Sequence, residues 1–368
     1  MGATKTSLKT ILAGSAAASI ALLSACGEAP DENGSKSSGN TYGDSEASFK
    51  ACMVTDSGGI DDRSFNESGW NGFKEAVDNN DDIVATYRQS DSSADFEPNL
   101  RGATNDECDI VIGVGGLMTD QVTEVAEANP DQRYGIVDAH VDADNVFSME
   151  FNAAQSSFLA GYAAAGTSET ETVATWGGVK IPPVTIFMDG FVEGVEQYNA
   201  DNDADVDVLG WDPEDQEGSF TGDFEDTGAG KSLTENFIAQ GADVIHPVAG
   251  PVGLGGAAAI QESDGVTMVW VDSDGYESLP EENQEYLLTS SMKNIAPAVE
   301  VAIQNAYDEG DMGGRYVGTL ENEGVSLAPF HDFDDDVSDE LKEEIEALKQ
   351  QIIDGDITVE SPAAPAEG

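Results

Sequence analysis

From Phe49 onward, the chain alternates short apolar runs with longer amphipathic stretches. In the stretches, apolar residues recur at helical spacing, as Trp70, Phe73 and Val77 do, and Pro130 marks the end of another. The apolar runs predict strands at 51–55, 83–87, 110–114 and 134–137, and the helices between them include 67–77 and 119–128. This alternation is typical of βα units around a mostly parallel sheet.

A second series repeats the same pattern. It predicts strands at 173–176, 206–209, 244–248 and 267–271, and helices at 187–198, 232–240 and 255–262. Two consecutive four-strand series predict an α/β protein with two similar lobes. Each lobe would be a mostly parallel sheet flanked by helices, with a ligand cleft between the lobes.

The later elements are expected to return and pack on these lobes. A helix is predicted at 292–309, a glycine-containing hairpin at 316–327, and a helix at 338–354 whose apolar residues share one face. Both lobes would then be discontinuous in sequence. We expect the first lobe at 49–150 plus about 286–318, the second at 151–285 plus about 319–360, and a disordered tail at 361–368.

The N-terminus has the pattern of a secretion signal. Residues 1–26 hold two lysines and no acid, and an apolar run at 11–23 is too short for a membrane-spanning helix. The run ends in Leu-Ser-Ala-Cys26, which resembles a bacterial lipobox, so Cys26 is the predicted lipidation site; the alternative is a buried thiol. The polar, glycine- and serine-rich residues 27–48 are predicted to be a flexible tether.

Charge narrows the functions that the chain can have. Its 368 residues contain 72 acidic and 15 basic side chains, giving a formal net charge of -57, which rules out the basic surface of a nucleic-acid-binding domain. With 39% hydrophobic residues the chain is nevertheless globular in composition. Acid-rich surfaces suit concentrated salt, so we hypothesise a salt-tolerant source.

Besides Cys26, the chain has two cysteines, Cys52 and Cys108, each near the start of a predicted strand. These are the first and third strands, which are commonly neighbours in a doubly wound sheet. A disulfide is therefore plausible outside the cytoplasm, and the alternative is two buried thiols.

The loop at residues 56–66 carries the most distinctive chemistry. It follows the first strand, where open α/β sheets bind ligands, and its two glycines allow a sharp turn. Ser64 or Asn66 could cap the next helix. Phe65 either fills the core or stacks on a planar ligand, and the pattern alone leaves both open.

Two other segments resemble known binding loops but lack a glycine that such loops require. A phosphate-loop look-alike ending at Ser232 has Glu225 where glycine is required, and an acidic loop at 201–212 has Val206 at the glycine position of a calcium loop. The three histidines are scattered. We therefore expect no metal, no cofactor and no catalytic centre.

Several ordered motifs resemble one known family. They are VTDSGGIDDRSFNESGWNGF (54–73), FNAAQSSFLAGYAA (151–164), FMDGFVEGV (187–195), GADVIHPVAGPVGLGG (241–256), VDSDGY (271–276), TSSMKN (289–294) and NEGVSLAP (322–329). This set resembles the basic membrane protein family of substrate-binding lipoproteins, the purine nucleoside receptor type. The resemblance implies a type I periplasmic-binding fold that closes on a guanosine, adenosine or inosine. It also implies delivery to the permease and ATPase of an ABC importer by a lipid-anchored, extracytoplasmic monomer.

The resemblance also implies roles for individual residues. Phe65 and Phe191 would sandwich the purine. Asn66 and Asp138 would hydrogen-bond the edge of the base, and Asp272 and Lys293 would hold the ribose hydroxyls. Gly250 would let the backbone approach the sugar, and Asp56 is a weaker candidate for a contact with the base or the ribose. From the residues alone, Asp138 could cap a turn, Phe191 could belong to the core, and Lys293 could be solvated.

Competing functions remain at this stage. A related binder of another small polar ligand, such as a sugar, would keep the acids of the cleft but would not need two phenylalanines as a stacking pair. A nucleoside-cleaving enzyme would need a positioned base and usually a metal-bound water, and a surface adhesin would leave the cleft residues unexplained. The high negative charge favours neutral nucleosides over nucleotides as ligands.

Overall fold

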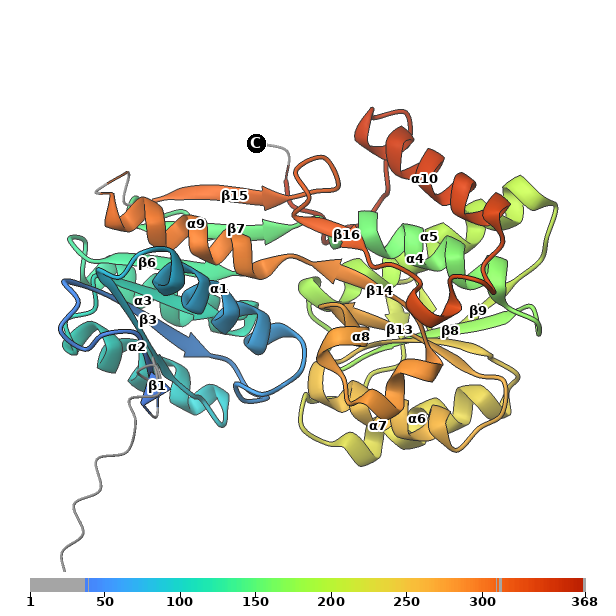
Figure 1. The fold of residues 1–368 in the computed structure, drawn as a ribbon, viewed down its shortest axis with the longest axis horizontal. Coiled ribbons are helices and arrows are strands. Elements are labelled where there is room, and N and C mark those ends of the chain that lie inside the picture. The colour runs from blue at the N-terminus through green and yellow to red at the C-terminus, as the bar shows by residue number, and fades with distance from the viewer. Residues whose placement is uncertain (1–36, 39, 309, 311–312, 367–368) are drawn as a thin grey trace, which may run out of the picture. The chain divides into compact units, whose positions relative to one another are not determined.

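A computed structural model describes residues 37–38, 40–308, 310 and 313–366 (Figure 1). The predicted signal segment, Cys26 and the start of the predicted tether lie outside the described residues. Within them, two sheets each carry their own helices, and no helix is long and apolar enough to cross a membrane. The predicted α/β class is confirmed.

The first sheet has the strand order β1-β2-β4-β3-β5-β6-β7-β15, and its pairs from β4 to β15 are parallel. Its strands are β1 (Ser37–Ser38), β2 (Thr41–Tyr42), β3 (Phe49–Thr55), β4 (Ile83–Arg88), β5 (Ile110–Val114), β6 (Arg133–Val137), β7 (Val146–Phe151) and β15 (Gly314–Gly318). Its helices are α1 (Phe65–Asn79), α2 (Phe96–Asn105), α3 (Thr119–Ala128) and α9 (Ile295–Tyr307). We call this sheet with its helices the first lobe.

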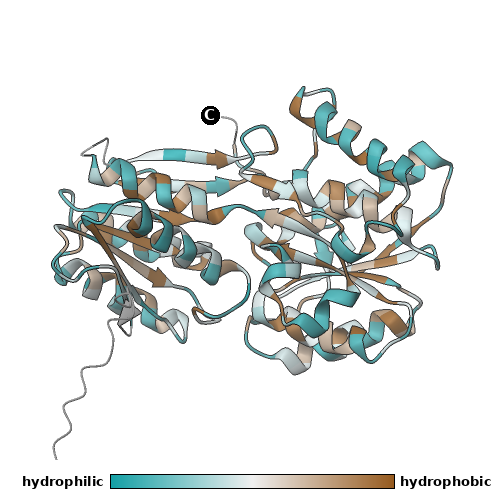
Figure 2. Cartoon of the chain, viewed as in Figure 1, coloured by the Kyte–Doolittle hydropathy of each residue, from teal (hydrophilic) through white to brown (hydrophobic). Residues whose placement is uncertain are grey.

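Alternation along β3 explains how this lobe is layered. Met53 packs in the core cluster that contains Phe73 of α1, whereas Val54 packs in the cluster that contains Phe96 and Leu100 of α2. Neighbouring residues of a strand point to opposite faces, so one apolar strand supports helices on both sides. Figure 2 shows the hydrophobic strands enclosed by helices whose outer faces are hydrophilic.

The second sheet has the order β16-β14-β13-β12-β8-β9, parallel except for β14 with β16. Its strands are β8 (Thr172–Gly177), β9 (Asp207–Leu209), β12 (Val244–Val248), β13 (Thr267–Asp272), β14 (Leu287–Lys293) and β16 (Val325–Leu327). The helices are α4 (Ala153–Thr167), α5 (Pro182–Asn202), α6 (Thr227–Ala239), α7 (Gly253–Gln261), α8 (Gly275–Ser278) and α10 (Asp339–Ile353), and β10 (Trp211–Asp212) pairs with β11 (Glu217–Gly218). We call this assembly the second lobe.

Short 3-10 helices complete the described elements. They lie at Ser93–Asp95, Gly116–Met118, Gly250–Val252, Glu281–Tyr286 and His331–Phe333. The long helices α4 and α5 pack closely because glycines face backbone: a side chain at Gly190 or Gly194 would collide with carbonyl oxygens of α4. Close packing of these two helices fixes the position of α5, which carries part of the site described below.

The order in which the chain crosses between the lobes differs from the prediction. Strand β14 pairs with β13 in the second sheet, so the chain returns to the first lobe only with α9, after residue 293 rather than near 286. The predicted hairpin at 316–327 is wrong, because β15 pairs with β7 in the first sheet and β16 with β14 in the second. Long-range pairing of this kind leaves no local sequence signal.

Both ends of the described chain are more ordered than predicted. Thr41 and Tyr42 pair with β4, so the segment 27–48 is not a free tether up to residue 48. At the other end, the Ser361 hydroxyl donates to Asp189 Oδ2 at 2.5 Å, and Ala363 and Ala364 pack against the core. Residues 361–366 therefore form an ordered strap on α5 instead of a disordered tail.

A disulfide joins Cys52 of β3 to Cys108, with 6.0 Å between their Cα atoms. It ties the centre of the first sheet to the turn before β5.

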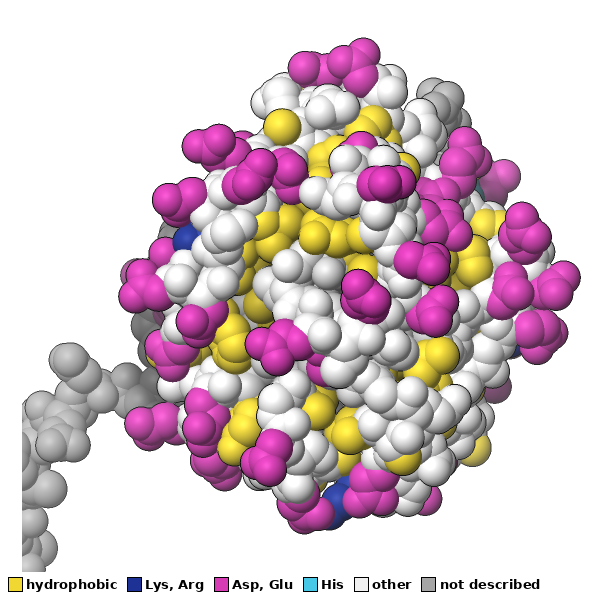
Figure 3. Space-filling view, turned by 90° about the vertical axis from the view of Figure 1, so that its right-hand side faces the viewer, with side chains coloured by type: hydrophobic (Ala, Val, Ile, Leu, Met, Phe, Trp, Pro, Cys, Tyr) yellow, Lys and Arg dark blue, Asp and Glu magenta, His cyan; other side chains and the backbone are white. Residues whose placement is uncertain are grey.

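The acidic composition appears on the surface: Figure 3 shows aspartate and glutamate side chains spread over the face that it draws, with few lysines or arginines between them.

Candidate functional site

A pocket of about 60 Å³ lies where the carboxyl ends of the strands of both sheets meet. The first lobe lines it with Asp56, Ser57, Asp62, Phe65, Asn66, Gly115, Gly116 and Asp138. The second lobe lines it with Ile181, Pro183, Val184, Phe187, Phe224, Val248, Ala249, Gly250, Pro251, Val271, Asp272 and Lys293. This edge is where open α/β sheets bind ligands.

Asp62 organises the first-lobe wall. Its carboxylate accepts hydrogen bonds from the backbone N–H groups of Ser64, Asn66 and Glu67 at 3.1, 2.7 and 3.0 Å. The predicted cap on Ser64 or Asn66 is therefore wrong, since Asp62 satisfies the free N–H groups at the start of α1. Burial raises the pKa of Asp62 from 3.8 to about 6 in spite of these bonds.

Because Asp62 caps the helix, the neighbouring side chains are available for other contacts. Asn66 donates from Nδ2 to Asp56 Oδ1 at 3.0 Å, while Asn66 Oδ1 is buried without a partner. Ser64 donates from its hydroxyl to Asp272 Oδ2 at 2.9 Å and so reaches the second lobe. The loop that the sequence singled out thus contacts both lobes.

Lys293, the last residue of β14, is 2% exposed and lies between two aspartates. Its Nζ is 2.8 Å from Asp138 Oδ2 and 3.4 Å from Asp272 Oδ1. Burial alone would lower the pKa of Lys293, but the two carboxylates outweigh burial and raise it. Burial also raises the pKa of Asp138, against the effect of Lys293.

Asp138 and Asp272 occupy equivalent places in the two lobes. Asp138 directly follows β6, Asp272 ends β13, and each has a φ of 66°. Positive φ is uncommon for residues other than glycine and is most often tolerated by Asn and Asp. The same local turn thus aims one carboxylate from each lobe at a single lysine.

Two aromatic rings flank the same ammonium group. Lys293 Nζ lies 5.2 Å from the ring centre of Phe65 and 4.9 Å from that of Phe187, and Phe224 also lines the pocket. Phe191 does not line it: this residue is fully buried and packs against His246, with ring centres 5.1 Å apart. Phe191, which the resemblance implied as one of two stacking rings, is therefore not at the pocket, and Phe187, one helical turn earlier, lines it.

Gly250 lines the pocket at a φ of 50°, in the conformation that favours glycine. A side chain there would meet no protein atom within 4 Å. Glycine is thus explained by its backbone conformation, and the space beside it is open.

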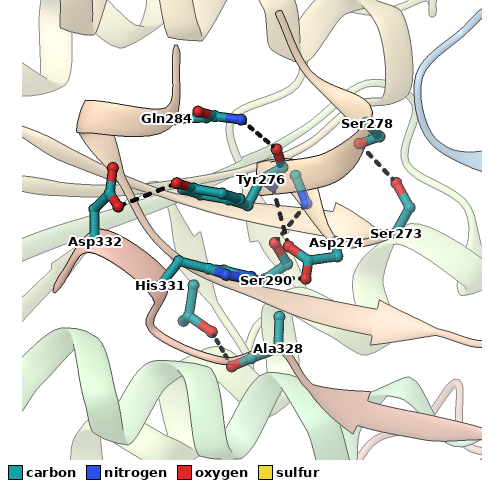
Figure 4. Close-up of polar contacts among 11 residues, drawn as sticks. Ser273, Asp274, Tyr276, Ser278, Gln284, Ser290, Ala328, His331 and Asp332 are labelled. Carbon is teal, nitrogen blue, oxygen red and sulfur yellow. Dashed lines mark hydrogen bonds and ion pairs between the residues drawn. The ribbon is translucent and has the colours of Figure 1, made fainter. Parts of the chain in front are cut away.

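A polar network that the sequence analysis missed holds the loop after Asp272 (Figure 4). His331 Nε2 lies 2.8 Å from Asp274 Oδ2, and its ring stacks on Tyr276 at 4.2 Å. Tyr276 donates from its hydroxyl to Asp332 at 3.1 Å, and Gly275 N–H donates to the Ser290 hydroxyl at 3.0 Å. The motif VDSDGY signals this loop, but its partner His331 is far along the chain.

The strap formed by residues 361–366 helps to enclose a second cavity, of about 350 Å³. Ala363 and Pro365 line it together with His140 and Glu150 of the first lobe. It shares Asp138 and Lys293 with the main pocket. The ion pair therefore lies in the wall that the two spaces share.

The arrangement suits reversible binding of a small ligand. Aromatic rings, an amide and an ion pair converge on the pocket, and across the described ranges no group of three or more side chains is arranged to hold a metal ion. Fold and site together define a two-lobed α/β binding protein.

Comparison with known proteins gives the particular family. Residues 49–362 match the family described as ABC transporter substrate-binding protein PnrA-like, and the chain belongs to this family. It is 33% identical over 359 residues to a CD4+ T-cell-stimulating antigen of Listeria monocytogenes, covering 93% of this chain and 95% of that protein. It is 31% identical over 363 residues to the ABC transporter nucleoside-binding protein BmpA of Lactococcus lactis, covering 94% and 97%.

A solved structure has the same fold. An ABC transporter solute-binding protein of Aeropyrum pernix K1 superposes with a TM-score of 0.77 at 24% identity, covering 85% of this chain and 94% of that one. The resemblance seen in the motifs is confirmed. The chain is accordingly an extracytoplasmic substrate-binding protein that works with the permease and ATPase of an ABC transporter, and it is not an enzyme.

Proposed function

We propose that this protein captures purine nucleosides, namely guanosine, adenosine or inosine, and delivers them to its ABC importer. The observation that carries the proposal is the pair of rings, Phe65 and Phe187, on opposite lobes of one pocket. Their centres lie no more than about 10 Å apart, given their distances to Lys293 Nζ. A planar base between two rings needs about 7 Å, so a small adjustment of the lobes would create a stacking slot.

The polar residues divide the remaining contacts. Asn66 and Asp138 are assigned to the edge of the base, where an amide offers both a donor and an acceptor. Asp272 and Lys293 are assigned to the ribose hydroxyls, and the open space beside Gly250 would admit the sugar. The name of the Lactococcus relative, a nucleoside-binding protein, supports the same ligand class.

Binding would require the lobes to move. Ser64 donates to Asp272 across the cleft, and the Ser273 hydroxyl donates to the Arg63 carbonyl at 3.1 Å. With these contacts in place the main pocket holds only about 60 Å³, so a nucleoside would enter after they break. The ligand would then favour closure through contacts with both walls.

We also propose that the protein is a monomer anchored by lipid on Cys26 after removal of residues 1–26. The lipobox-like sequence before Cys26 supports this. Cys26→Ala should leave the protein unlipidated, and it should then be released from the membrane fraction. Retention of that variant in the membrane would contradict the proposed anchor.

The test of the ligand is calorimetric titration of ligand-stripped protein with guanosine, adenosine, inosine, uridine and ribose. We expect micromolar or tighter binding of at least one purine nucleoside and weak binding of ribose. Phe187→Leu keeps apolar volume but removes the ring, so it should weaken purine binding by at least about fivefold, the lower end of one base-stacking contact. Phe191→Leu is the matched control, expected to lower thermal stability while affinity stays near wild type.

The runner-up function is binding of a sugar or another small polar ligand. It would appear as ribose binding that equals or exceeds purine binding and is insensitive to Phe187→Leu. That result would leave the family assignment in place and contradict the nucleoside proposal.

A further inference from the structure

We propose that Asp56 is a neutral carboxylic acid in the ligand-free site. In the complex it keeps its proton and donates a hydrogen bond to an acceptor atom on the base. The inference rests on the proposed function, because it names the kind of ligand atom that the first-lobe wall recognises.

Charge in this pocket is unbalanced. Four aspartates line it with little exposure: 8% for Asp56, 2% for Asp62, 7% for Asp272, and 6% for the side chain of Asp138. Among the described residues, Lys293 is the one cation of the lining. Four ionised carboxylates would leave three uncompensated charges in a largely dehydrated space, which is strongly unfavourable.

Three of the four carboxyls have partners that stabilise their charge. Asp62 accepts from three backbone N–H groups of α1. Asp138 and Asp272 share Lys293, and Asp272 also accepts from the Ser64 hydroxyl. Each of these three carboxyls therefore has either several hydrogen-bond donors or a cation at its oxygens.

Asp56 lacks a partner of that strength. Its one hydrogen bond to a described side chain comes from the neutral amide of Asn66, and no lysine or arginine nitrogen of the described chain lies within 4.0 Å of it. Its Oδ2 lies against Gly115, where a side chain would collide with the carboxyl. The fold thus places this carboxyl close to backbone and more than 4.0 Å from the ammonium of Lys293.

The surrounding charges act in the same direction. Burial, followed by the negative charges of Asp62, Asp138 and Asp272, outweighs the Asn66 hydrogen bond and raises the pKa of Asp56 well above its usual value. Lys293 also belongs to the lining, but its ammonium lies between Asp138 and Asp272. Of the four carboxyls, Asp56 is therefore the one that keeps its proton.

A neutral acid changes what this wall can recognise. A carboxylate only accepts hydrogen bonds, whereas a carboxylic acid also donates one. Next to it, Asn66 Oδ1 is buried without a partner and can accept. The pair therefore fits a base edge that offers an acceptor beside a donor, such as the oxygen and adjacent N–H of a 6-oxopurine.

Titrations between pH 5 and 8, where inosine keeps its N1–H proton, test the proposal with inosine as the probe. Above the pKa of Asp56, wild-type affinity should fall by up to about tenfold per pH unit, because one proton must be taken up on binding. Asp56→Asn keeps a donor that cannot ionise, so its affinity should not follow this fall, and at high pH it should bind inosine more tightly than wild type. Asp56→Ala should bind more weakly than Asp56→Asn at every pH.

A ligand-free measurement separates this inference from the proposed function. Carbon-13 NMR of labelled aspartate, assigned by comparison with Asp56→Asn, should show one carboxyl still protonated at pH 7. An Asp56 carboxyl that is ionised at pH 7, or an Asn variant that binds no better than the Ala variant, would overturn the inference. Failure of the wild type to bind any nucleoside would contradict the proposed function, and the NMR result would still decide the protonation of Asp56.

Discussion

The two walls of the pocket differ in chemistry although the lobes that build them share one fold. The first-lobe wall is polar: Asp56, Asp62, Asn66 and Asp138 surround a single ring, that of Phe65. The second-lobe wall is mainly apolar, with rings and aliphatic side chains around one ion pair. Apolar surface supplies binding energy without direction, whereas hydrogen-bonding groups have fixed geometry.

This difference indicates a division of labour. The second lobe would provide most of the affinity, and the first would select among ligands of similar shape. Lys293 links the two walls, because it comes from the second sheet but its shortest ion pair is with Asp138 of the first lobe. Variants that affect one wall at a time should therefore separate affinity, selectivity and stability.

The largest effect is expected for Lys293→Met, which removes the cation that the walls share. Asp138 and Asp272 would then be buried near each other without a counter-charge, at a cost of about 3–5 kcal/mol in the free energy of unfolding. Denaturant titration measures this loss, and Lys231→Met, at a partly exposed lysine paired with Glu262, is the control and should change little. Wild-type stability for Lys293→Met would contradict the importance of the shared cation.

Next in size is the disulfide, which stabilises the first lobe but lies away from its polar wall. Cys52 and Cys108 are 56 residues apart, so opening this loop should cost about 4 kcal/mol in the chain-entropy description. Replacing both cysteines by alanine should lower the denaturation midpoint. Ligand affinity measured well below that midpoint should be unchanged, and a large loss of affinity would mean that the first wall depends on this cross-link.

Asp62 provides a test by pH. Its pKa is raised from 3.8 to about 6 in the folded protein, so folding favours the protonated form. The associated stability is fully present below about pH 4 and is lost as pH rises through 6, by up to about 3 kcal/mol. Urea denaturation of wild type and Asp62→Asn at pH 4 and pH 7 measures this effect. Relative to the variant, the wild type should be less stable at pH 7 than at pH 4, and the opposite change would refute the assignment.

The smallest expected effect concerns the strap on the second lobe. The Glu360 N–H donates to Glu193 Oε2 at 2.9 Å, and burial, with nearby acids adding to it, raises the pKa of Glu193 to about 7. Because this pKa is raised, its contribution to stability is lost as pH rises through 7. Amide exchange of residues 359–366 should be faster at pH 8 than at pH 6 after correction for intrinsic rates, and Glu193→Gln should remove that difference.

How far the sequence predicts this molecule depends on whether a feature is local. The strand at 110–114 and the helix at 119–128 are found at the predicted bounds, because apolar periodicity and a following Asn-Pro are local signals. The sheet that β14 joins, and the separation of β15 from β16, depend on pairings between distant segments. No window of sequence contains that information.

The same distinction applies to the site. Most of the predicted residues meet at the pocket because they lie at the carboxyl end of a strand or within two residues of it, a position that can be read from the sequence. They are Asp56, Asp138, Gly250, Asp272 and Lys293. Phe187 and Phe191 are one helical turn apart on one face of α5, and only the packing of α5 against α4 decides which ring reaches the pocket. The capping role of Asp62 was missed because Ser64 and Asn66, close by in the same loop, are also residue types that cap helices. The contacts of His331 were missed because they involve a loop more than fifty residues away.

The lysine shared by Asp138 and Asp272 also constrains how the protein can evolve. Lys293 of the second lobe serves the aspartates of both lobes, so a substitution at one aspartate changes the electrostatic surroundings of the other across the cleft. Changes at the two aspartates should therefore be inherited together rather than independently. A lineage that lost one carboxylate would retain a lysine whose pKa is less elevated. Different residues would then be tolerated at the position of the other aspartate, on the opposite lobe.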